Sequence, residues 1–167
     1  MDIRILDIVE GTSVDGPGLR TSIYMAGCRH HCPGCHNPQS WDFEAGKPMS
    51  VDEIIQIVAF NDFDVTLSGG DPMYQPDTVA YLCRRIKQEI GKRIWCYTGF
   101  SWEQLTATPD TREALQWIDV IVDGLFVEAQ ADTSLLFRGS ANQRIIDVAA
   151  SLRAGMAIEW SDSAYLE

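Results

Sequence analysis

The sequence predicts an α/β fold in a single domain, built on a mainly parallel sheet. Segments rich in β-branched and aromatic residues alternate with segments of helical periodicity, which is the pattern of βαβ units. No repeat, low-complexity tract or linker divides the chain, so we expect one domain over residues 1–167. A complete (β/α)8 barrel needs about 250 residues, and this chain has 167. We therefore expect an incomplete, partial TIM-like barrel with one open side.

Each element has a local sequence signal. Six segments have the residue content of strands, and these are residues 3–9, 21–26, 64–67, 94–98, 119–122 and 144–148. The turn-rich stretch VDGPG at residues 14–18 separates the first two. Helices are expected after the capping boxes at residues 50–53 and 101–104, from residue 76 or 77 to Gly91, and over residues 111–117.

Composition and charge exclude several classes of function. The formal net charge of −11 argues against a nucleic-acid partner, because phosphate binding depends on clustered Lys and Arg. No run of about 18 apolar residues occurs, so we expect no membrane span. The N-terminal segment carries Asp2, Arg4 and Asp7 and does not have the pattern of a signal peptide. Five cysteines, three of them crowded together, favour a reducing compartment, and we expect a cytoplasmic protein.

The crowded cysteines are Cys28, Cys32 and Cys35. Their spacing would place them on one face of a helix, but Pro33 and Gly34 lie between them and strongly disfavour a helix there. We therefore expect a loop. A loop that holds three thiols close together normally binds metal.

Spacing alone leaves two kinds of metal site open. Zinc prefers four ligands, and His30, His31 or His36 could supply the fourth. Iron–sulfur clusters also use Cys thiolates in tight loops. A four-iron cluster held by three cysteines would leave one iron without a protein ligand, available to a substrate or cofactor.

The spacing C-x3-C-x2-C resembles the signature of the radical S-adenosylmethionine (SAM) enzymes. The resemblance extends, in order, over roughly residues 1–148. The segments that carry it are DGPGLR (15–20), CPGCHNPQSW (32–41), LSGGDP (67–72), WCYTGF (95–100), VDGLFVE (122–128) and FRGSANQRIID (137–147). Together they are similar to the activating proteins of anaerobic ribonucleoside-triphosphate reductases.

That resemblance implies a mechanism, cofactors and partners. The cofactors would be a [4Fe-4S] cluster and SAM, whose amino and carboxylate groups bind the unique iron. An electron from the cluster would cleave the sulfonium C–S bond and give a 5′-deoxyadenosyl radical. The radical would take a hydrogen atom from a backbone glycine of the large glycyl-radical subunit of the reductase. A low-potential electron donor such as a flavodoxin would supply the electron.

The resemblance also assigns residues to the cofactors. Cys28, Cys32 and Cys35 would bind the cluster. The Gly-Gly-acid motif, which would receive the methionyl amino group, is matched by Gly69, Gly70 and Asp71. The glycines would let the backbone approach the ligand, and the acid would complement an ammonium charge. Without the resemblance, the same segment would be a turn that ends a strand.

Further residues are candidates for contact with the cofactor or partner. Three in the cysteine loop would border the cofactor: Gly34, Cys35 and His36. Candidate contacts to cofactor or partner are Tyr97, Thr98, Arg138 and Asn142. We expect His30 and His31 to face solvent, and we expect Cys83 and Cys96 to be buried as small apolar side chains.

Three alternatives remain at this stage. One is another small radical SAM enzyme or glycyl-radical activase with a different substrate. Another is a zinc-stabilised binding module without catalysis, and the last is a simple electron carrier. For residues 154–167 the sequence does not distinguish an additional strand from a loose tail.

Overall fold

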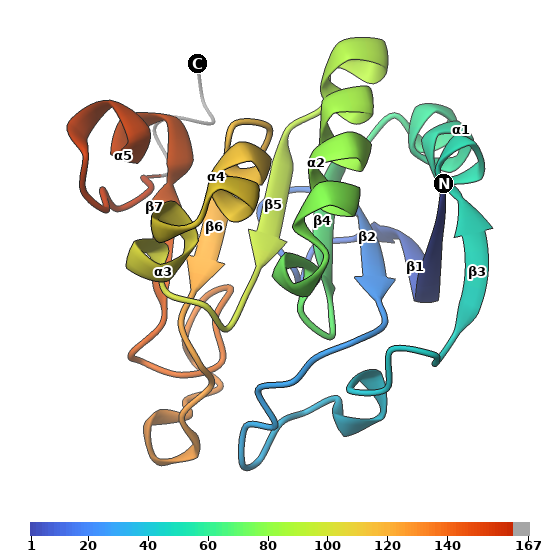
Figure 1. Cartoon of the computed structure of the whole chain (residues 1–167). Helices are drawn as coiled ribbons and strands as arrows, with labels where there is room; N and C mark the ends of the chain where they lie inside the picture. The colour runs from blue at the N-terminus through green and yellow to red at the C-terminus, as the bar shows by residue number, and fades with distance from the viewer. Residues whose placement is uncertain (162–167) are drawn as a thin grey trace.

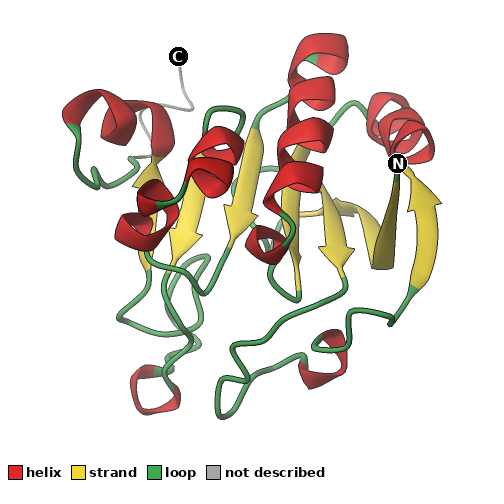
Figure 2. Cartoon of the chain, in the orientation of Figure 1, coloured by secondary structure: helices red, strands yellow, loops and turns green. Residues whose placement is uncertain are grey.

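A mixed seven-stranded sheet organises the part of the chain that the structure describes (Figure 1, Figure 2). The structure is a computed structural model and describes residues 1–161. The strand order is β3-β1-β2-β4-β5-β6-β7. The strands are β1 (Asp2–Thr12), β2 (Arg20–Met25), β3 (Lys47–Ser50), β4 (Asp64–Gly69), β5 (Ile94–Tyr97), β6 (Val120–Asp123) and β7 (Arg144–Asp147).

The helices pack against one face of the sheet (Figure 1). They are α1 (Val51–Asn61), α2 (Pro76–Arg85), α3 (Trp102–Ala107), α4 (Pro109–Leu115) and α5 (Val148–Ala154). Helices α1 to α4 lie between strands in the chain, and α5 follows β7. A π-helical turn, Ile86–Ile90, extends α2 to Gly91, whose φ of +75° ends the helix. Among residues 1–161, no helix combines the length and the apolar character needed to cross a membrane.

The prediction of an α/β fold is confirmed, and the sheet is mixed, with a parallel centre and antiparallel strands on both sides. The central strands β2, β4, β5 and β6 are parallel neighbours. The pairs β1–β2, β1–β3 and β6–β7 are antiparallel. The connection from β1 to β2 is too short for the crossover that parallel strands require. The described sheet has two separate edge strands, β3 and β7, and is open; the partial TIM-like barrel stays a prediction.

Most element positions follow the sequence signals closely. Ser50 accepts the N–H of Glu53 at the start of α1, and Ser101 and Gln104 form a complete capping box at α3. The sequence signals missed two elements. Strand β3 contains Pro48, which is unfavourable in strands, and α5 begins where the last predicted strand was expected to end.

The two faces of the sheet carry different side chains. Val65, Leu67 and Ile94 pack under the helices in the main core. Both Cys83 and Cys96 lie in the same core with no exposed surface, which confirms their prediction as buried apolar side chains. On the opposite face, a smaller cluster centres on Trp95, Val120 and Val122. Loops, rather than helices, cover this second face within the described residues.

Arg20 fastens the loop between β1 and β2 to the second face. The side chain is fully buried. Its guanidinium donates to the carbonyls of Pro17 and Val65, each at 2.9 Å, and to the Thr66 hydroxyl at 2.8 Å. A Cβ at Gly16 would lie 2.9 Å from the Arg20 side chain, so glycine is needed for this packing. The DGPG turn is therefore held over the sheet by a buried cation.

The described part of the C-terminal segment packs beside β7. Glu159 forms an antiparallel bridge with Ile146, and the Trp160 N–H donates to the Ile145 carbonyl at 2.9 Å. This segment forms a bridge rather than a full strand. The sequence did not distinguish an additional strand from a loose tail in this segment. Its last part, residues 162–167, lies outside the described residues.

We predict that Arg20→Met destabilises the fold. The substitution leaves the two carbonyl oxygens and the Thr66 hydroxyl without the guanidinium donors, and we expect a loss of about 2–4 kcal/mol in the free energy of unfolding. Urea titration measures the change, with the exposed Arg112→Met on α4 as the matched control. Equal unfolding midpoints for the two variants would contradict the role of Arg20.

Candidate functional site

The candidate site lies where four parallel strands end. The carboxyl ends of β2, β4, β5 and β6 point to the same edge of the sheet, at the bottom of Figure 1. Ligands in α/β sheets bind at this edge, because the loops that follow the strands meet there. The cysteine loop follows β2, the Gly-Gly-Asp turn follows β4, and the segment from Thr98 follows β5.

A hollow of about 340 Å³ brings most of the predicted site residues together, while Gly34, Arg138 and Asn142 do not line it. All three loop cysteines line it and are partly exposed. The other residues that were predicted to form the site and that line the hollow are His36, Gly69, Gly70, Asp71, Tyr97 and Thr98. The sequence motifs, far apart in the chain, thus surround one space.

Backbone hydrogen bonds hold the cysteine loop to the segment that follows it. The N–H of Gly27 donates to Ser40 at 2.8 Å, and the N–H of Cys28 donates to Trp41 at 3.2 Å. A turn closes between Cys32 and Cys35, with a 3.1 Å hydrogen bond. The segment is a loop, as the proline and glycine within it predict.

The environment of Cys28 opposes formation of an isolated thiolate. Burial raises the pKa of the Cys28 thiol, and the nearby Asp71, Cys32 and Cys35 raise it further, while a backbone hydrogen bond from His30 acts in the opposite direction. A cysteine binds metal as the thiolate. A metal centre in the hollow would therefore supply the positive charge that this thiolate needs.

The donor set fits an iron–sulfur centre better than a closed zinc site. Within residues 1–161, no three His, Cys, Asp or Glu side chains are placed to hold a single metal ion. The three loop thiols instead share the wall of a hollow much larger than one ion. His30, His31 and His36, the candidate fourth ligands, each have another neighbour.

His30 is not solvent-facing, which corrects the sequence prediction. Its side chain is 12% exposed, and its Nε2 lies 2.6 Å from Asp71 Oδ2. Aromatic rings surround it, with ring centroids 5.0 Å away at Tyr74 and 4.7 Å away at Phe100. Its position beside Cys28 gave no signal of this burial, because the neighbouring rings come from distant segments.

The other two histidines of the loop are exposed. His31 stacks on Trp41 with ring centroids 4.4 Å apart, and His36 tilts against Phe126 at 5.1 Å. His31 therefore agrees with the expectation of a solvent-facing residue. His36 lines the hollow, so its position suits the predicted contact with a cofactor, and that contact stays a prediction.

The Gly-Gly-Asp turn lies directly against the start of the cysteine loop. The N–H of Gly70 donates to Met25 at 2.9 Å, and the N–H of Asp71 donates to Gly27 at 2.8 Å. A Cβ at Gly69 would collide with the Met25 backbone, and one at Gly70 would collide with the Gly27 backbone. Only glycine permits this close approach of two backbones.

The Asp71 carboxylate is buried and surrounded by donors. Its side chain is 2% exposed. Oδ2 accepts the Thr98 hydroxyl at 3.0 Å and the Gly99 N–H at 2.8 Å, in addition to the contact with His30. Oδ1 accepts the Met73 N–H at 3.0 Å. Thr98 is thus a partner of Asp71, and its predicted contact with cofactor or partner remains untested.

A groove of about 650 Å³ adjoins the hollow on the helix-free face of the sheet. One wall is formed by Val14 and Asp15, in the loop that contains the DGPG turn. The other wall is formed by the loop segment 131–139. Five residues line both spaces, namely Asp15, His36, Ser68, Tyr97 and Gly139. Sequence reasoning gave no role to Asp15 or Ser68, although both belong to quoted motifs.

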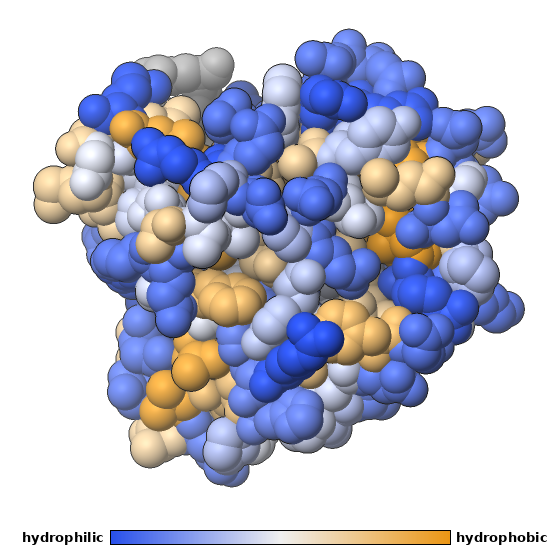
Figure 3. Space-filling model, viewed as in Figure 1, coloured by the Kyte–Doolittle hydropathy of each residue, from blue (hydrophilic) through white to orange (hydrophobic). Residues whose placement is uncertain are grey.

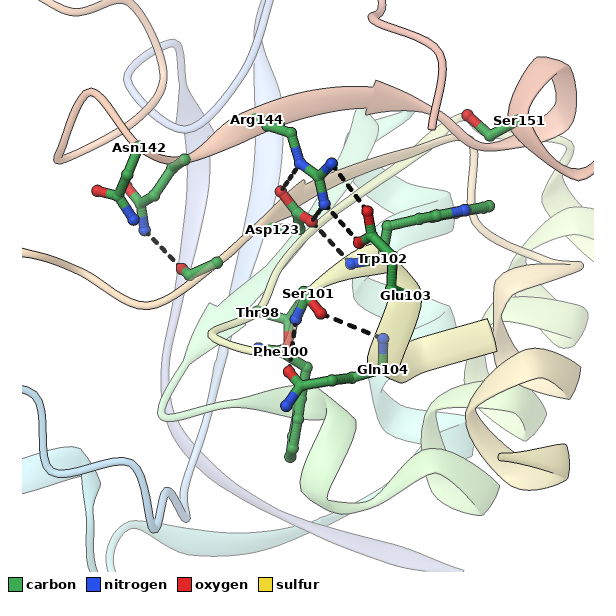
Figure 4. Close-up of polar contacts among 12 residues, drawn as sticks. Thr98, Phe100, Ser101, Trp102, Glu103, Gln104, Asp123, Asn142, Arg144 and Ser151 are labelled. Atoms are coloured by element: carbon green, nitrogen blue, oxygen red, sulfur yellow. Dashed lines mark hydrogen bonds and ion pairs between the residues drawn. The ribbon is translucent and has the colours of Figure 1, made fainter. Parts of the chain in front are cut away.

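Hydrogen bonds fix the groove wall to the sheet. The Tyr97 hydroxyl donates to the Phe137 carbonyl at 2.8 Å, and burial raises the pKa of Tyr97. Arg138 lines the groove and donates to the Gln143 carbonyl at 2.7 Å. Asn142 donates to the Leu125 carbonyl at 2.8 Å (Figure 4) and lines neither space. The predicted contacts of Arg138 and Asn142 with a ligand stay predictions.

An ion-pair network secures the adjacent end of the sheet (Figure 4). Arg144 on β7 pairs with the buried Asp123 at 2.6 Å and with Glu103 at 2.7 Å. Asp123 also accepts the N–H of Trp102 at 2.7 Å, at the first residue of α3. The network fixes the start of α3, and with it the turn that carries Thr98.

Apolar side chains gather on the surface near the groove. Figure 3 shows hydrophobic residues at the lower left of the view, over the loop that follows β6. Leu125 is 46% exposed and Leu136 is 63% exposed, and both lie in this loop. These exposed leucines give the loop an apolar surface that another protein can cover favourably.

Comparisons with known proteins place the chain in a family with an iron–sulfur cluster. A family model described as a 4Fe-4S single cluster domain matches residues 14–146. Three similar curated proteins are each called anaerobic ribonucleoside-triphosphate reductase-activating protein. The protein of Haemophilus influenzae is 38% identical, covering 79% of this chain and 90% of that protein. The Escherichia coli K12 protein is 39% identical (78% and 89%), and the phage T4 protein is 32% identical (79% and 86%).

We predict that Cys28→Ala, Cys32→Ala and Cys35→Ala each abolish assembly of the cluster, because each removes one thiolate from the hollow. Iron and acid-labile sulfide, measured after anaerobic reconstitution, check the result. Cys83→Ala and Cys96→Ala are the matched controls and keep both, since these thiols are buried in the core. Full iron and sulfide in any loop variant would refute the ligand assignment.

Proposed function

Because the chain belongs to the family of anaerobic ribonucleoside-triphosphate reductase-activating proteins and carries a 4Fe-4S single cluster domain, we propose that it is a radical SAM enzyme. It cleaves SAM reductively at a [4Fe-4S] cluster and generates a glycyl radical on the large subunit of an anaerobic ribonucleotide reductase. The observation that carries this proposal is the single hollow shared by the three loop cysteines and the Gly-Gly-Asp turn.

The residues in the hollow suit both cofactors. Cys28, Cys32 and Cys35 would hold three irons of the cluster and leave the fourth to SAM. When bound, these groups supply one-electron cleavage of a C–S bond and a radical that abstracts hydrogen. The glycines at positions 69 and 70 keep side chains away from the place where the backbone must approach the ligand.

Within the cysteine loop, Gly34 lies against a neighbouring loop. Gly34 has a φ of +75°, and a Cβ there would lie 2.8 Å from the Glu128 side chain. A larger residue would therefore disturb the contact between the cysteine loop and the loop after β6. We propose that Gly34, Cys35 and His36 border the adenosyl part of SAM, as the position of His36 between the two spaces supports.

The groove gives the protein substrate a route to the hollow. A segment carrying the target glycine would enter between Asp15 and the loop segment 131–139, and Tyr97 and Ser68 would form its floor next to the cofactor. The exposed Leu125 and Leu136, on the loop that contributes one wall of the groove, support docking of a large subunit at this loop. We extend the proposal to one radical SAM domain over residues 1–167, with a partial barrel that stays open for this entry.

Reduction of the cluster requires an external electron in each cycle. A low-potential carrier such as a flavodoxin would supply it, in a cytoplasmic setting where thiols stay reduced. A different small radical SAM enzyme would share the hollow but require another substrate. A zinc-stabilised binding module would contain zinc and no labile sulfide.

We predict two products in sequence from the reconstituted protein. With dithionite and SAM it forms 5′-deoxyadenosine, scored by chromatography. With the large reductase subunit added, it produces a glycyl radical, scored by electron paramagnetic resonance (EPR). Deoxyadenosine without a glycyl radical would favour another substrate. Tightly bound zinc without labile sulfide, and no deoxyadenosine, would overturn the proposal.

A variant in the groove separates the two stages. Thr133 is exposed and lines the groove but not the hollow. Thr133→Trp should therefore leave deoxyadenosine formation without the partner intact and reduce glycyl-radical formation at least tenfold. The matched control is Glu113→Trp, exposed on α4 away from the groove. Equal radical yields in the two variants would contradict entry through the groove.

A further inference from the structure

We propose that His30 and Asp71 form a brace that positions the cysteine loop, and that the Asp71 carboxylate does not receive the ammonium group of SAM. This inference deepens the proposed function, and its cofactor part rests on it. It assigns His30, the middle residue between the first two cysteines, as a positioning residue. It also reverses the role that the sequence suggests for the acid of the Gly-Gly-acid motif.

The first argument is that the Asp71 carboxylate already has its hydrogen-bond partners. Oδ2 lies within 3.0 Å of three donors, at His30, Thr98 and Gly99. Oδ1 accepts from Met73 at 3.0 Å. A carboxylate oxygen offers about two lone pairs, so Oδ2 is saturated. Oδ1 keeps one free lone pair, but the side chain is only 2% exposed, so an ammonium in the hollow has little access to it.

The second argument is the origin of those donors. His30 belongs to the loop after β2, Met73 follows β4, and Thr98 and Gly99 follow β5. Asp71 itself lies in the turn after β4. One buried carboxylate therefore connects the ends of three neighbouring parallel strands. Hydrogen bonds to charged groups are stronger than neutral ones, and their loss in a buried setting is costly.

The third argument is the enclosure of the His30 ring. Beyond Asp71, its Nδ1 lies 3.3 Å from the Tyr74 hydroxyl, and the rings of Tyr74 and Phe100 pack around it. A Cβ at Gly99 would lie 2.6 Å from the imidazole, so the chain keeps a glycine where the ring passes. The imidazole of His30 is therefore enclosed by groups from two other loops.

The residues on either side of His30 are fixed as well. The Arg29 guanidinium lies 4.6 Å from the centre of the Phe43 ring, and His31 stacks on Trp41. All three residues between Cys28 and Cys32 thus contact the body of the protein. His30 is the only one of the three that is not exposed, so it provides the buried anchor.

The anchor lies close to the first cysteine. His30 follows Cys28 by two residues, so a shift of His30 moves the backbone that carries this thiol. A centre held by three thiolates needs them pre-positioned, because the loop has no regular secondary structure of its own. Loss of the brace should therefore weaken retention of the cluster before it affects SAM.

Three substitutions test the brace. His30→Ala removes the side chain, and His30→Gln restores a donor of similar reach. Asp71→Glu keeps the negative charge but adds a methylene in an enclosed space. His31→Ala is the matched control, since this neighbouring histidine is exposed. Each protein is examined by melting temperature without metal, by iron release to a chelator after reconstitution, and by EPR of the reduced cluster with and without SAM.

The brace predicts one pattern for the variants. His30→Ala and Asp71→Glu lower the melting temperature of the metal-free protein by about 4–8 °C. Both variants lose iron to the chelator at least about tenfold faster than the wild type. His30→Gln recovers part of each loss, and His31→Ala behaves as the wild type. The cluster that His30→Ala retains still changes its EPR spectrum when SAM is added.

The opposite pattern would overturn the brace. If Asp71 receives the ammonium, Asp71→Glu keeps the melting temperature and the iron, and only its response to SAM changes. Wild-type stability and iron retention in His30→Ala would equally refute the role of His30. Failure of the proposed function has a different signature, because the wild-type protein itself would then assemble no cluster or show no response to SAM. The melting temperatures still test the brace in that case.

Discussion

The site depends on holding a loop without regular secondary structure at the edge where four parallel strands end. The loop of Cys28, Cys32 and Cys35 is placed there by contacts with neighbouring segments. The Gly-Gly-Asp turn can lie against it because neither glycine carries a side chain. The buried Asp71 carboxylate then joins the ends of neighbouring strands. A cluster held by these three thiols would need them pre-positioned, since all three would bind together.

The division of the sheet into two faces gives the site its access. The helices bury one face in the main core, which makes the strand ends rigid. The opposite face carries loops fastened by single polar side chains, Arg20 for the DGPG turn and Tyr97 for the loop before β7. Those loops form the groove that leads to the hollow. In the proposed function, a protein substrate would reach the cofactor through this groove without any rearrangement of the core.

The sequence predicted the element order and the cysteine loop well, since strands and capping boxes have local signals. It missed β3, because Pro48 hides a strand that forms only by pairing with β1. It placed His30 in solvent, because the rings of Tyr74 and Phe100 that bury it come from distant segments. The groove could not be predicted either, since its walls come from two loops whose contact depends on the tertiary fold.

The central claim is that the chain leaves one iron of the cluster to SAM. Electron–nuclear double resonance of the reduced cluster, with SAM labelled by 15N at its amino group, tests this claim most directly. The account predicts a 15N coupling that appears only with labelled SAM and is absent with the unlabelled compound. A coupling that instead arises from a histidine nitrogen of this chain, with none from SAM, would show that the protein itself fills the fourth position and would contradict the account.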